Sequence, residues 1–310
     1  MFRRGLLLNS EVKIVAEAQL KIYRAAIVEK FPELTLKSIK YLSEGWDSVA
    51  CRVNERLIFR FPKRAEVERT LLKEIGLLPE LGPALPLPIP QFKYISEKPG
   101  QLFPFAFVGY EMIKGEQLEN CSPEVQEADW WRRAVGDFLT ALHAFPVKRA
   151  QAFGVEIFAS TQEKSFQTWR EWLEQFYLDS QAKIFPMLAD KYQTAIGQEF
   201  ENFLRNEANF QFEPVLIHGD LNEEHILLDP ATQRVTGIID FGDAGIGDPA
   251  YDVTEDILPY YKGKLDATWQ QRRHFYRKLG PLQIMFYAKK AGDMALLEFS
   301  NYELERLWPI

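Results

Sequence analysis

The spacing of apolar residues changes twice along the chain and separates two kinds of structure. Near the start, apolar side chains recur every three or four positions, which predicts a helix over about residues 10–30. The apolar stripe of this helix consists of Val15, Ala18, Ile22 and Ala25. The period then becomes two, which is typical of strands. Three consecutive strands are predicted, at Leu36–Leu42, Ser48–Val53 and Leu57–Phe61.

Turn and breaker residues divide the rest of this region. Gly45 and the pair Asn54-Glu55 are expected to make the turns between the three strands. A helix follows over about residues 65–78, and Pro79 with Gly82-Pro83 is expected to end it. After a proline-rich connector, two more strands are predicted. They cover Phe92–Ser96 and Phe105–Met112 and would complete an antiparallel sheet of five strands.

After Gly115 the pattern is mainly helical. Ser122-Pro123 is a suitable cap and first-turn proline for a helix that runs to about Ala144. Further helix is predicted over about 161–206 and again to the C-terminus, with residues 215–252 as an interruption. These patterns predict an α+β protein of two lobes, a small sheet-rich lobe at 1–112 and a larger helical lobe at 113–310. A cleft between two lobes is a favourable place for a ligand.

Composition narrows the class of function. The 310 residues carry a formal charge of −7, whereas a nucleic-acid-binding protein needs a basic face. Cys51 and Cys121 are too few for a disulfide framework or a zinc site. The apolar run Leu6–Leu8 is too short for a signal peptide, and no stretch approaches the length of a membrane span. We therefore expect a cytoplasmic protein with neither nucleic-acid nor membrane partners.

The segment 215–252 holds the candidate chemistry. It reads VLIHGDLNEEHILLDPATQRVTGIIDFGDAGIGDPAYD and places His218, Asp220, His225 and Asp240 beside short apolar runs. Phosphoryl transfer needs an acceptor hydroxyl held in line and Mg²⁺ on the phosphates. Asp220 and Asp240 suit these two tasks. The same four residues are also a possible metal cluster, so a metal-dependent hydrolase is an alternative.

Two stretches of this segment carry a family resemblance. HGDLNEEHIL and IIDFGDAGIGDPAYD resemble the catalytic and metal-binding loops of the aminoglycoside phosphotransferase family. The resemblance implies a two-lobed protein-kinase-like fold, with Asp220 as the catalytic base and Asp240 as a Mg²⁺ ligand. It also implies that Asp252 braces the catalytic loop. His225 stands where such kinases usually have asparagine. In this it resembles the aminoglycoside 2''-kinases and macrolide kinases, which use histidine there, and His225 is assigned to the metal.

The N-terminal lobe extends the resemblance. Its stretch RLIFRFPKRAEVERTLLKEIGLLPEL implies that Arg60 and Glu74 hold the nucleotide phosphates. Arg60 stands where relatives usually have lysine, and Glu74 stands at the position of their helix glutamate. Lys63 is the alternative phosphate cation. The segment SEGWDS occupies the position of the nucleotide loop, and FVGYEMIKGEQL resembles the linker that receives the purine. The nucleotide-binding residues expected from these segments are Ser43, Gly45, Ser48, Glu111, Met112 and Ile113.

Several other residues have a structural interpretation beside a functional one. His218 and His143 are expected to be structural. The tryptophans at 130, 131, 169 and 172 are expected to pack between helices rather than stack on a substrate. Acidic residues crowd the catalytic segment, either as a solvated rim or as an attraction for a cationic substrate. They are Glu223, Glu224, Asp243, Asp248, Glu255 and Asp256.

The resulting hypothesis is a Mg²⁺-dependent kinase with ATP or GTP as co-substrate. Its partners would be a nucleoside triphosphate and a hydroxyl-bearing, aminoglycoside-like, cationic small molecule. A macrolide kinase and a metabolic kinase of choline or sugar type are alternatives within the same fold. A pseudokinase that binds nucleotide without catalysis is a further alternative, against which the intact Asp220 and Asp240 argue.

Overall fold

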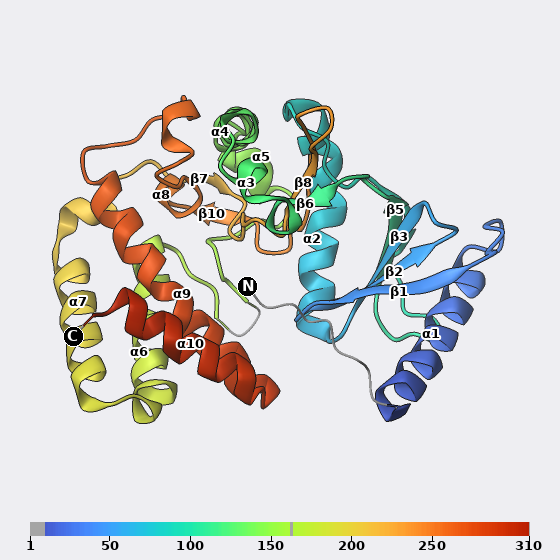
Figure 1. The fold of residues 1–310 in the computed structure, drawn as a ribbon, viewed down its shortest axis with the longest axis horizontal. Coiled ribbons are helices and arrows are strands. Elements are labelled where there is room, and N and C mark those ends of the chain that lie inside the picture. The colour runs from blue at the N-terminus through green and yellow to red at the C-terminus, as the bar shows by residue number, and fades with distance from the viewer. Residues whose placement is uncertain (1–9, 162–163, 310) are drawn as a thin grey trace. The chain divides into compact units, whose positions relative to one another are not determined.

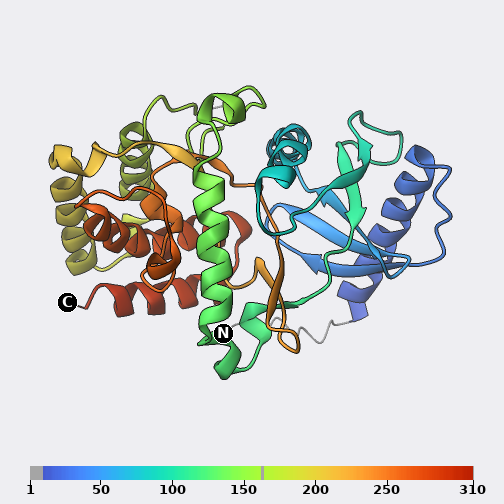
Figure 2. The ribbon, with the colours of Figure 1, turned by 90° about the horizontal axis from the view of Figure 1, so that it is seen from above.

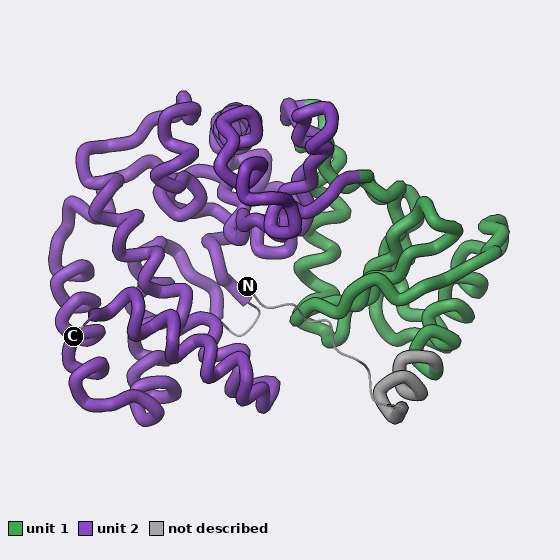
Figure 3. The backbone as a smooth tube through the Cα atoms, in the orientation of Figure 1, with its two compact units in different colours: residues 1–83, 88–114 green, residues 84–87, 115–310 purple. Residues whose placement is uncertain are grey.

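The computed structural model of the chain describes residues 10–161 and 164–309. Its contacts divide the chain into two compact units (Figure 3). Unit 1 comprises residues 1–83 and 88–114, and unit 2 comprises residues 84–87 and 115–310.

Unit 1 is built on a five-stranded antiparallel sheet with the order β1-β2-β3-β5-β4. The strands are β1 (Ile39–Glu44), β2 (Ser48–Val53), β3 (Leu57–Pro62), β4 (Phe92–Ser96) and β5 (Phe107–Glu111). The predicted sheet is therefore confirmed. Asn54 and Glu55, which join β2 to β3, both have positive φ, as the tight hairpin turn requires.

Two helices, α1 (Ser10–Lys30) and α2 (Ala65–Leu81), cover opposite faces of this sheet (Figures 1 and 2). On one face, Phe61 of β3 stacks on Tyr23 of α1 with a ring-centroid distance of 4.3 Å. Because successive side chains of a strand point to opposite faces, Arg60 lies on the other side, toward α2. The alternation in β3 thus places aromatic side chains on the α1 face of the sheet and the guanidinium of Arg60 on the α2 face.

Two details of the helices in unit 1 differ from the sequence expectation. The buried face of α1 contains Tyr23, Ala26 and Ile27, whereas Ile22 of the expected stripe is 46% exposed. The aromatic core of the sheet accepts Tyr23 and so sets the rotation of the helix. Helix α2 does not end before Pro79 but continues to Leu81, a buried residue whose packing offsets the hydrogen bond that the proline removes.

Unit 2 is mainly helical. Its helices are α3 (Pro123–Gln126), α4 (Asp129–His143), α5 (Val147–Gln151), α6 (Trp169–Lys183), α7 (Asp190–Arg205), α8 (Pro249–Asp252), α9 (Trp269–Ala291) and α10 (Met294–Leu307). Short 3-10 turns occur at Gly82–Ala84, Leu118–Asn120, Phe185–Met187, Glu207–Phe210 and Leu258–Tyr260. None of the helices in the described ranges combines the length and apolarity that a membrane crossing requires.

Two of the predicted helices are divided. The expected helix from Pro123 to about Ala144 breaks at Glu127 and Ala128, between α3 and α4. The expected helix over 161–206 begins only at Trp169, where Thr168 accepts a capping hydrogen bond from the backbone of Glu171. It is interrupted between α6 and α7, where the 3-10 turn contains a proline.

Two small sheets of unit 2 position the candidate chemistry. Strands β7 (Val215–Ile217) and β10 (Gly245–Gly247) pair antiparallel. Strands β6 (Glu116–Gln117), β8 (Ile226–Asp229) and β9 (Arg234–Ile238) form the other sheet. The chain between β7 and β8 and the chain between β9 and β10 are the two loops that the sequence singled out.

Candidate active site

The catalytic loop begins where β7 ends, and its first turn depends on Gly219. This residue has a φ of +84°, and a Cβ there would lie 2.5 Å from the backbone oxygen of Asp243. Only glycine accommodates both the left-handed backbone and the close approach of the second loop. Gly219 therefore brings the two loops together.

Asp252 of α8 braces this turn from inside the unit. Its carboxylate accepts hydrogen bonds from the backbone N–H of His218, at 2.6 Å, and of Gly219, at 3.0 Å. His143 of α4 lies 3.3 Å from the same carboxylate. Burial alone would raise the pKa of Asp252, but the hydrogen bonds from His143 and from the backbone of His218 lower it below its ordinary value. The geometry thus gives Asp252 and His143 structural positions.

His218 is fully buried and neutral. Its Nε2 lies 3.2 Å from the carbonyl oxygen of Ile239, so Nε2 carries the proton, and Nδ1 accepts from the backbone N–H of Asp220 at 3.4 Å. Burial lowers the pKa of His218 to about 4. Its ring packs on Phe241 at 4.7 Å. Nε2 thus connects the two loops and Nδ1 binds within the catalytic loop, which leaves neither nitrogen for a metal.

Asp220 follows with its carboxylate half-exposed. Its Oδ1 accepts a hydrogen bond from Nδ2 of Asn222 at 3.1 Å. Burial raises the pKa of Asp220 to about 7, with Asp243 and Asp240 adding to the rise and His225 opposing it. A base acts best when its pKa lies near the operating pH, so these surroundings suit proton transfer.

His225 and Asp240 form a candidate metal pair. Nδ1 of His225 donates to the carbonyl oxygen of Asp220 at 2.7 Å, so Nε2 keeps a lone pair, and it lies 3.7 Å from Oδ2 of Asp240. Asp240 has a φ of +67°, a strained conformation of the kind that occurs at functional sites. Both atoms can contact one octahedral Mg²⁺, which usually takes few protein ligands and completes its shell with phosphates and water.

The four-residue cluster expected for a hydrolase does not form. His218 is turned into the core, and no three His, Cys, Asp or Glu side chains within residues 10–161 and 164–309 are placed to share a metal. Two ligands with open positions fit a metal bound together with a substrate better than a closed protein site.

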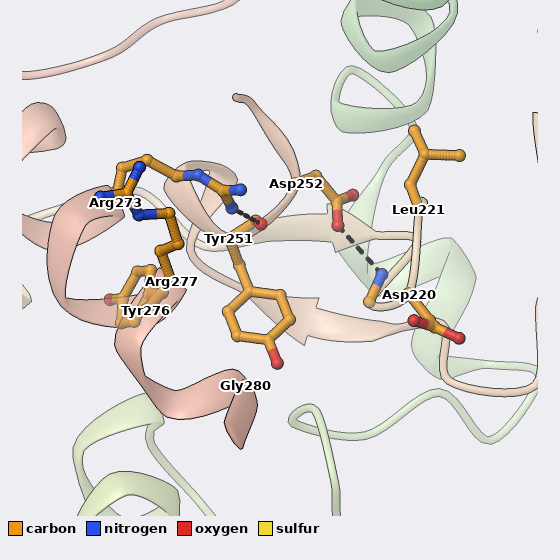
Figure 4. Close-up of a pocket in the computed structure, with 9 residues that line it drawn as sticks. Asp220, Leu221, Tyr251, Asp252, Arg273, Tyr276, Arg277 and Gly280 are labelled. Atoms are coloured by element: carbon orange, nitrogen blue, oxygen red, sulfur yellow. Dashed lines mark hydrogen bonds between the residues drawn. The ribbon is translucent and has the colours of Figure 1, made fainter. Parts of the chain in front are cut away.

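A cavity of about 250 Å³ opens beside Asp220 (Figure 4). The catalytic loop and α8 form one side of it, and α9 forms the other with Arg273 and Arg277. The full lining is Gly219, Asp220, Leu221, Tyr251, Asp252, Arg273, Tyr276, Arg277 and Gly280. The candidate base thus faces an open space that can hold a small molecule.

Both expectations for the acidic residues around the loop, a solvated rim and an attraction for a cationic substrate, require exposed carboxylates. Asp248 is fully buried, where it binds Arg272 at 2.5 Å, so it does not belong to a solvated surface. Asp256 lies 3.4 Å from Arg132. By contrast, Glu223 and Glu224 are exposed. The expectation for Asp248 is therefore wrong, because an arginine 24 positions along the chain folds back against it.

The expected helical packing of the tryptophans is observed for three of them. Trp131, Trp169 and Trp172 are buried. Trp169 and Trp172 contact each other at 4.5 Å, and Nε1 of Trp169 donates to Tyr276 on α9 at 2.9 Å. These rings join α6 to α9 rather than lining the cavity.

In unit 1, Arg60 and Glu74 form a two-pronged ion pair. NH1 and NH2 of Arg60 donate to the two carboxylate oxygens of Glu74 at 2.8 and 3.1 Å. Glu74 is fully buried, and the Arg60 side chain is 13% exposed. The pair joins β3 to α2, as expected for these residues. A planar guanidinium bound in this way keeps a fixed orientation.

Lys63 makes different contacts. Its Nζ binds the carbonyl oxygen of Gly45 at 2.8 Å and the carboxylate of Glu44 at 2.5 Å. Beside it, Arg64 donates to the carbonyl oxygen of Trp46 at 3.0 Å. Both cations thus hold the loop between β1 and β2, and neither pairs with the buried Glu74 of α2.

That loop and the linker are where nucleotide contacts were expected. Ser43 ends up within β1 and Ser48 begins β2, so the turn itself is short. The N–H of Gly45 donates to Ser48 at 3.0 Å. A Cβ on Gly45 would find ordinary contacts only, so its conformation does not require glycine.

In the linker, Glu111 pairs with Arg56 at 2.8 Å. The N–H of Met112 donates to the carbonyl oxygen of the same arginine at 2.8 Å, so this N–H is already used. Purine contacts at the linker therefore remain a prediction for the backbone of Glu111, for the Met112 carbonyl group and for Ile113.

Sequence reasoning missed two features of the site. Asn222 lies in the loop itself, and its position two residues after Asp220 is the only local signal for its contact with that carboxylate. Arg273 and Arg277 lie about fifty residues further along, one helical turn apart on α9. Their place in the cavity could not be read from the helical pattern.

Comparison with known proteins agrees with this geometry. A model of the phosphotransferase enzyme family matches residues 38–274. The complex of APH(2'')-IIIa with GDP and kanamycin superposes with a TM-score of 0.81 at 27% identity, over 92% of this chain and 97% of that one. Viomycin phosphotransferase of Streptomyces vinaceus is 26% identical over 251 residues, which are 76% of this chain and 78% of the relative.

A macrolide 2'-phosphotransferase from Brachybacterium faecium shares the fold, with a TM-score of 0.68 at 21% identity, over 95% of this chain and 99% of the other. The predicted family branch and the kinase-like fold are thus confirmed. The chain belongs to the phosphotransferase enzyme family and is a small-molecule kinase.

Proposed function

We propose that the protein transfers the γ-phosphoryl group of ATP or GTP to a hydroxyl of an aminoglycoside-like small molecule bound in the cavity beside Asp220. The observation that carries this proposal is the position of Asp220. Its carboxylate opens on the cavity, and its backbone carbonyl oxygen holds the imidazole of the candidate metal pair. One loop thereby connects acceptor and metal.

Asp220 acts in this proposal as the base. It orients the acceptor hydroxyl and takes its proton as the oxygen attacks phosphorus, and Asn222 fixes the rotation of the carboxylate. Burial raises the pKa of Asp220 to about 7, so Asp220 accepts the proton more readily than a carboxylate with an ordinary pKa would.

His225 and Asp240 would hold Mg²⁺. The ion, when bound, neutralises charge on the phosphate oxygens. The tautomer of His225 supports this assignment, since the hydrogen bond from Nδ1 directs the Nε2 lone pair toward Asp240.

In unit 1, Arg60 would contact the phosphates of the nucleotide, with Glu74 fixing its guanidinium. Ser43, Gly45 and Ser48 would surround the phosphates, and the linker would receive the purine. The GDP complex of the similar APH(2'')-IIIa supports a nucleotide co-substrate.

The identity of the acceptor rests on similarity and charge. The similar APH(2'')-IIIa forms a complex with kanamycin, which supports an aminoglycoside-like acceptor. The exposed carboxylates of Glu223, Glu224 and Asp243 support an amine on part of that acceptor.

The deciding experiment compares wild type with Asp220→Asn. We expect phosphoryl transfer to fall by about 10²–10⁴-fold, while nucleotide affinity stays the same. Nucleotide consumption would be measured against a panel of aminoglycosides, macrolides, choline and sugars. Turnover retained by Asp220→Asn would remove Asp220 from the role of base, and nucleotide binding without turnover of any acceptor would indicate a pseudokinase.

A further inference from the structure

The α9 side of the cavity beside Asp220 is basic. Arg273 and Arg277 lie one turn apart on this helix, and both line the cavity together with Gly280 (Figure 4). Gly280 has open space where a Cβ would be. A small molecule in the cavity would therefore meet two guanidinium groups next to an unobstructed stretch of helix.

Arg273 is only partly satisfied by the protein. One terminal nitrogen donates to the carbonyl oxygen of Tyr251 at 2.6 Å. Its Nε is buried and has no hydrogen-bond acceptor among the described residues, and the carboxylate of Glu255 lies 4.0 Å from it. Burial lowers the pKa of Arg273, as expected for a cation whose charge is incompletely balanced. A buried charge of this kind is costly unless something else pairs with it.

Arg277 is exposed, and it forms no ion pair with any residue of the described ranges. The neighbouring Arg272 shows the contrast. That side chain is fully buried, and it is neutralised by Asp248 at 2.5 Å and by Asp266 at 2.8 Å. The same helix thus neutralises the arginine that points into the core and leaves the two at the cavity available.

The carboxylates of the cavity do not balance these cations. Asp252 is already bound by the backbone of His218 and Gly219 and by His143. Asp220 is required for the reaction itself and shares its surroundings with Asp243 and Asp240. At the end of the cavity on α9, the carboxylate of Glu255 lies 4.0 Å from Arg273. With Arg277 unpaired within the described ranges, this end keeps a net positive charge, while the carboxylates of the catalytic loop lie at the other end.

We infer that the acceptor carries an acidic group, a carboxylate or a phosphate, which Arg273 and Arg277 bind while its hydroxyl lies at Asp220. This inference rests on the proposed function: it keeps phosphoryl transfer to a hydroxyl at Asp220 and adds an acidic group to the acceptor, which kanamycin lacks. Planar guanidinium groups match both anions through paired hydrogen bonds. An amine elsewhere on the acceptor is compatible with this arrangement, but a polyamine without an acidic group leaves Arg277 unpaired and Arg273 with only the carboxylate of Glu255 at 4.0 Å.

The test uses acceptors that differ only in the acidic group. Gluconate is compared with sorbitol and glycerol phosphate with glycerol, and kanamycin represents amine-bearing acceptors. In the wild type, the acidic member of a pair should have the higher kcat/KM. Arg277→Gln should raise the KM for the acidic member by about tenfold to a hundredfold, the usual value of a hydrogen bond between charged groups. The KM for nucleotide and for the uncharged member should not change.

Lys290→Gln is the matched control, because it removes one positive charge from α9 about 20 Å further along the helix axis. Arg273→Lys accompanies Arg277→Gln, since it keeps the charge but loses the guanidinium geometry, and its thermal stability is measured to separate misfolding from weaker binding. We expect Lys290→Gln to behave as wild type and Arg273→Lys to raise the same KM.

Two outcomes would contradict the inference in different ways. If sorbitol, glycerol or kanamycin is used as well as or better than the acidic acceptors, and Arg277→Gln has no effect, then the acidic group is wrong while the kinase activity stands. If none of the acceptors supports turnover that depends on Asp220, the proposed function fails and the inference fails with it.

Discussion

Nε2 of His225, the imidazole nitrogen that keeps a lone pair, faces the carboxylate of Asp240. Nε2 of His225 lies 3.7 Å from Oδ2 of Asp240, because Nδ1 is fixed by its hydrogen bond to the carbonyl oxygen of Asp220. An imidazole nitrogen with a lone pair therefore lies at the candidate metal site. The proposed base, through its backbone carbonyl oxygen, orients the proposed metal ligand.

The first prediction concerns this ligand. His225→Ala should require at least about tenfold more Mg²⁺ for half-maximal activity, since even partners outside the ligand shell are typically worth about 10–100-fold in metal affinity. His225→Asn should stay active, because an amide oxygen is a natural ligand for Mg²⁺. Activity is measured against Mg²⁺ concentration for all three proteins. The same Mg²⁺ dependence in wild type and His225→Ala would return His225 to a structural role.

The second prediction separates the two candidate phosphate cations. Arg60→Lys should raise the KM for nucleotide more than Lys63→Ala does, because Arg60 is held by the buried Glu74, whereas Lys63 binds the loop at Gly45. Lysine at position 60 retains a charge for Glu74 and so avoids an unpaired buried carboxylate, which costs about 3–5 kcal/mol.

The measurement is steady-state kinetics with nucleotide varied at saturating acceptor, with thermal unfolding as the control for folding. If Lys63→Ala is the more damaging change, Lys63 is the phosphate cation and Arg60 serves the link between β3 and α2.

The third prediction tests whether the acceptor binds in the cavity, by reducing the space available there. Gly280→Leu should raise the acceptor KM strongly and leave the nucleotide KM unchanged, because the new side chain enters the open space beside α9. Gly280→Ala adds only a Cβ and is the matched control. Both changes should stabilise the helix, by roughly 0.5–1 kcal/mol for alanine. Equal acceptor KM values in the wild type and Gly280→Leu would show that the acceptor binds elsewhere.

The fourth prediction concerns stability in acid. Burial lowers the pKa of His218 to about 4 from 6.5, so between these pH values the unfolded chain binds the extra proton and the folded protein does not. The free energy of unfolding should therefore decrease as pH falls through this range. A shift of this size corresponds to about 3 kcal/mol.

Asp220, with a pKa raised to about 7, acts in the opposite direction, because the folded protein holds its proton more tightly. Denaturant unfolding of wild type and His218→Gln at about pH 7 and pH 4.5 isolates the contribution of His218 to the free energy of unfolding. The wild type should lose more stability than the variant over this range. An equal change in the two proteins would contradict the assignment of His218 as a buried neutral group.

The parts of the fold that depend on local pattern could be predicted. Strand β2 has the predicted bounds, since its alternation and its flanking turns both lie in the local sequence. The rotation of α1 could not, because it depends on how Tyr23 stacks on Phe61 of a later strand. The passage of α2 through Pro79 likewise depends on packing around Leu81.

The candidate site divides in the same way. Asp220, His225 and Asp240 belong to two loops with a recognisable sequence, and the structure brings these three side chains together. The sequence groups Asp248 with the acidic residues expected at the surface, but its side chain is buried against Arg272, which lies 24 positions further along the chain on α9. The cavity wall formed by α9 was missed for the same reason.

The two sides of α9 differ in how far they can tolerate substitution. Arg272 anchors α9 to Asp248, in the segment after β10, and to Asp266. Because these carboxylates neutralise its buried charge, the attachment is sensitive to substitution of any of the three residues. Arg277 and Gly280, on the side of the cavity, contribute nothing to that anchor. Under the proposed function, mutations on this side would redirect the enzyme to new acceptors while the anchor of α9 stays intact, which makes this face of α9 a starting point for laboratory evolution.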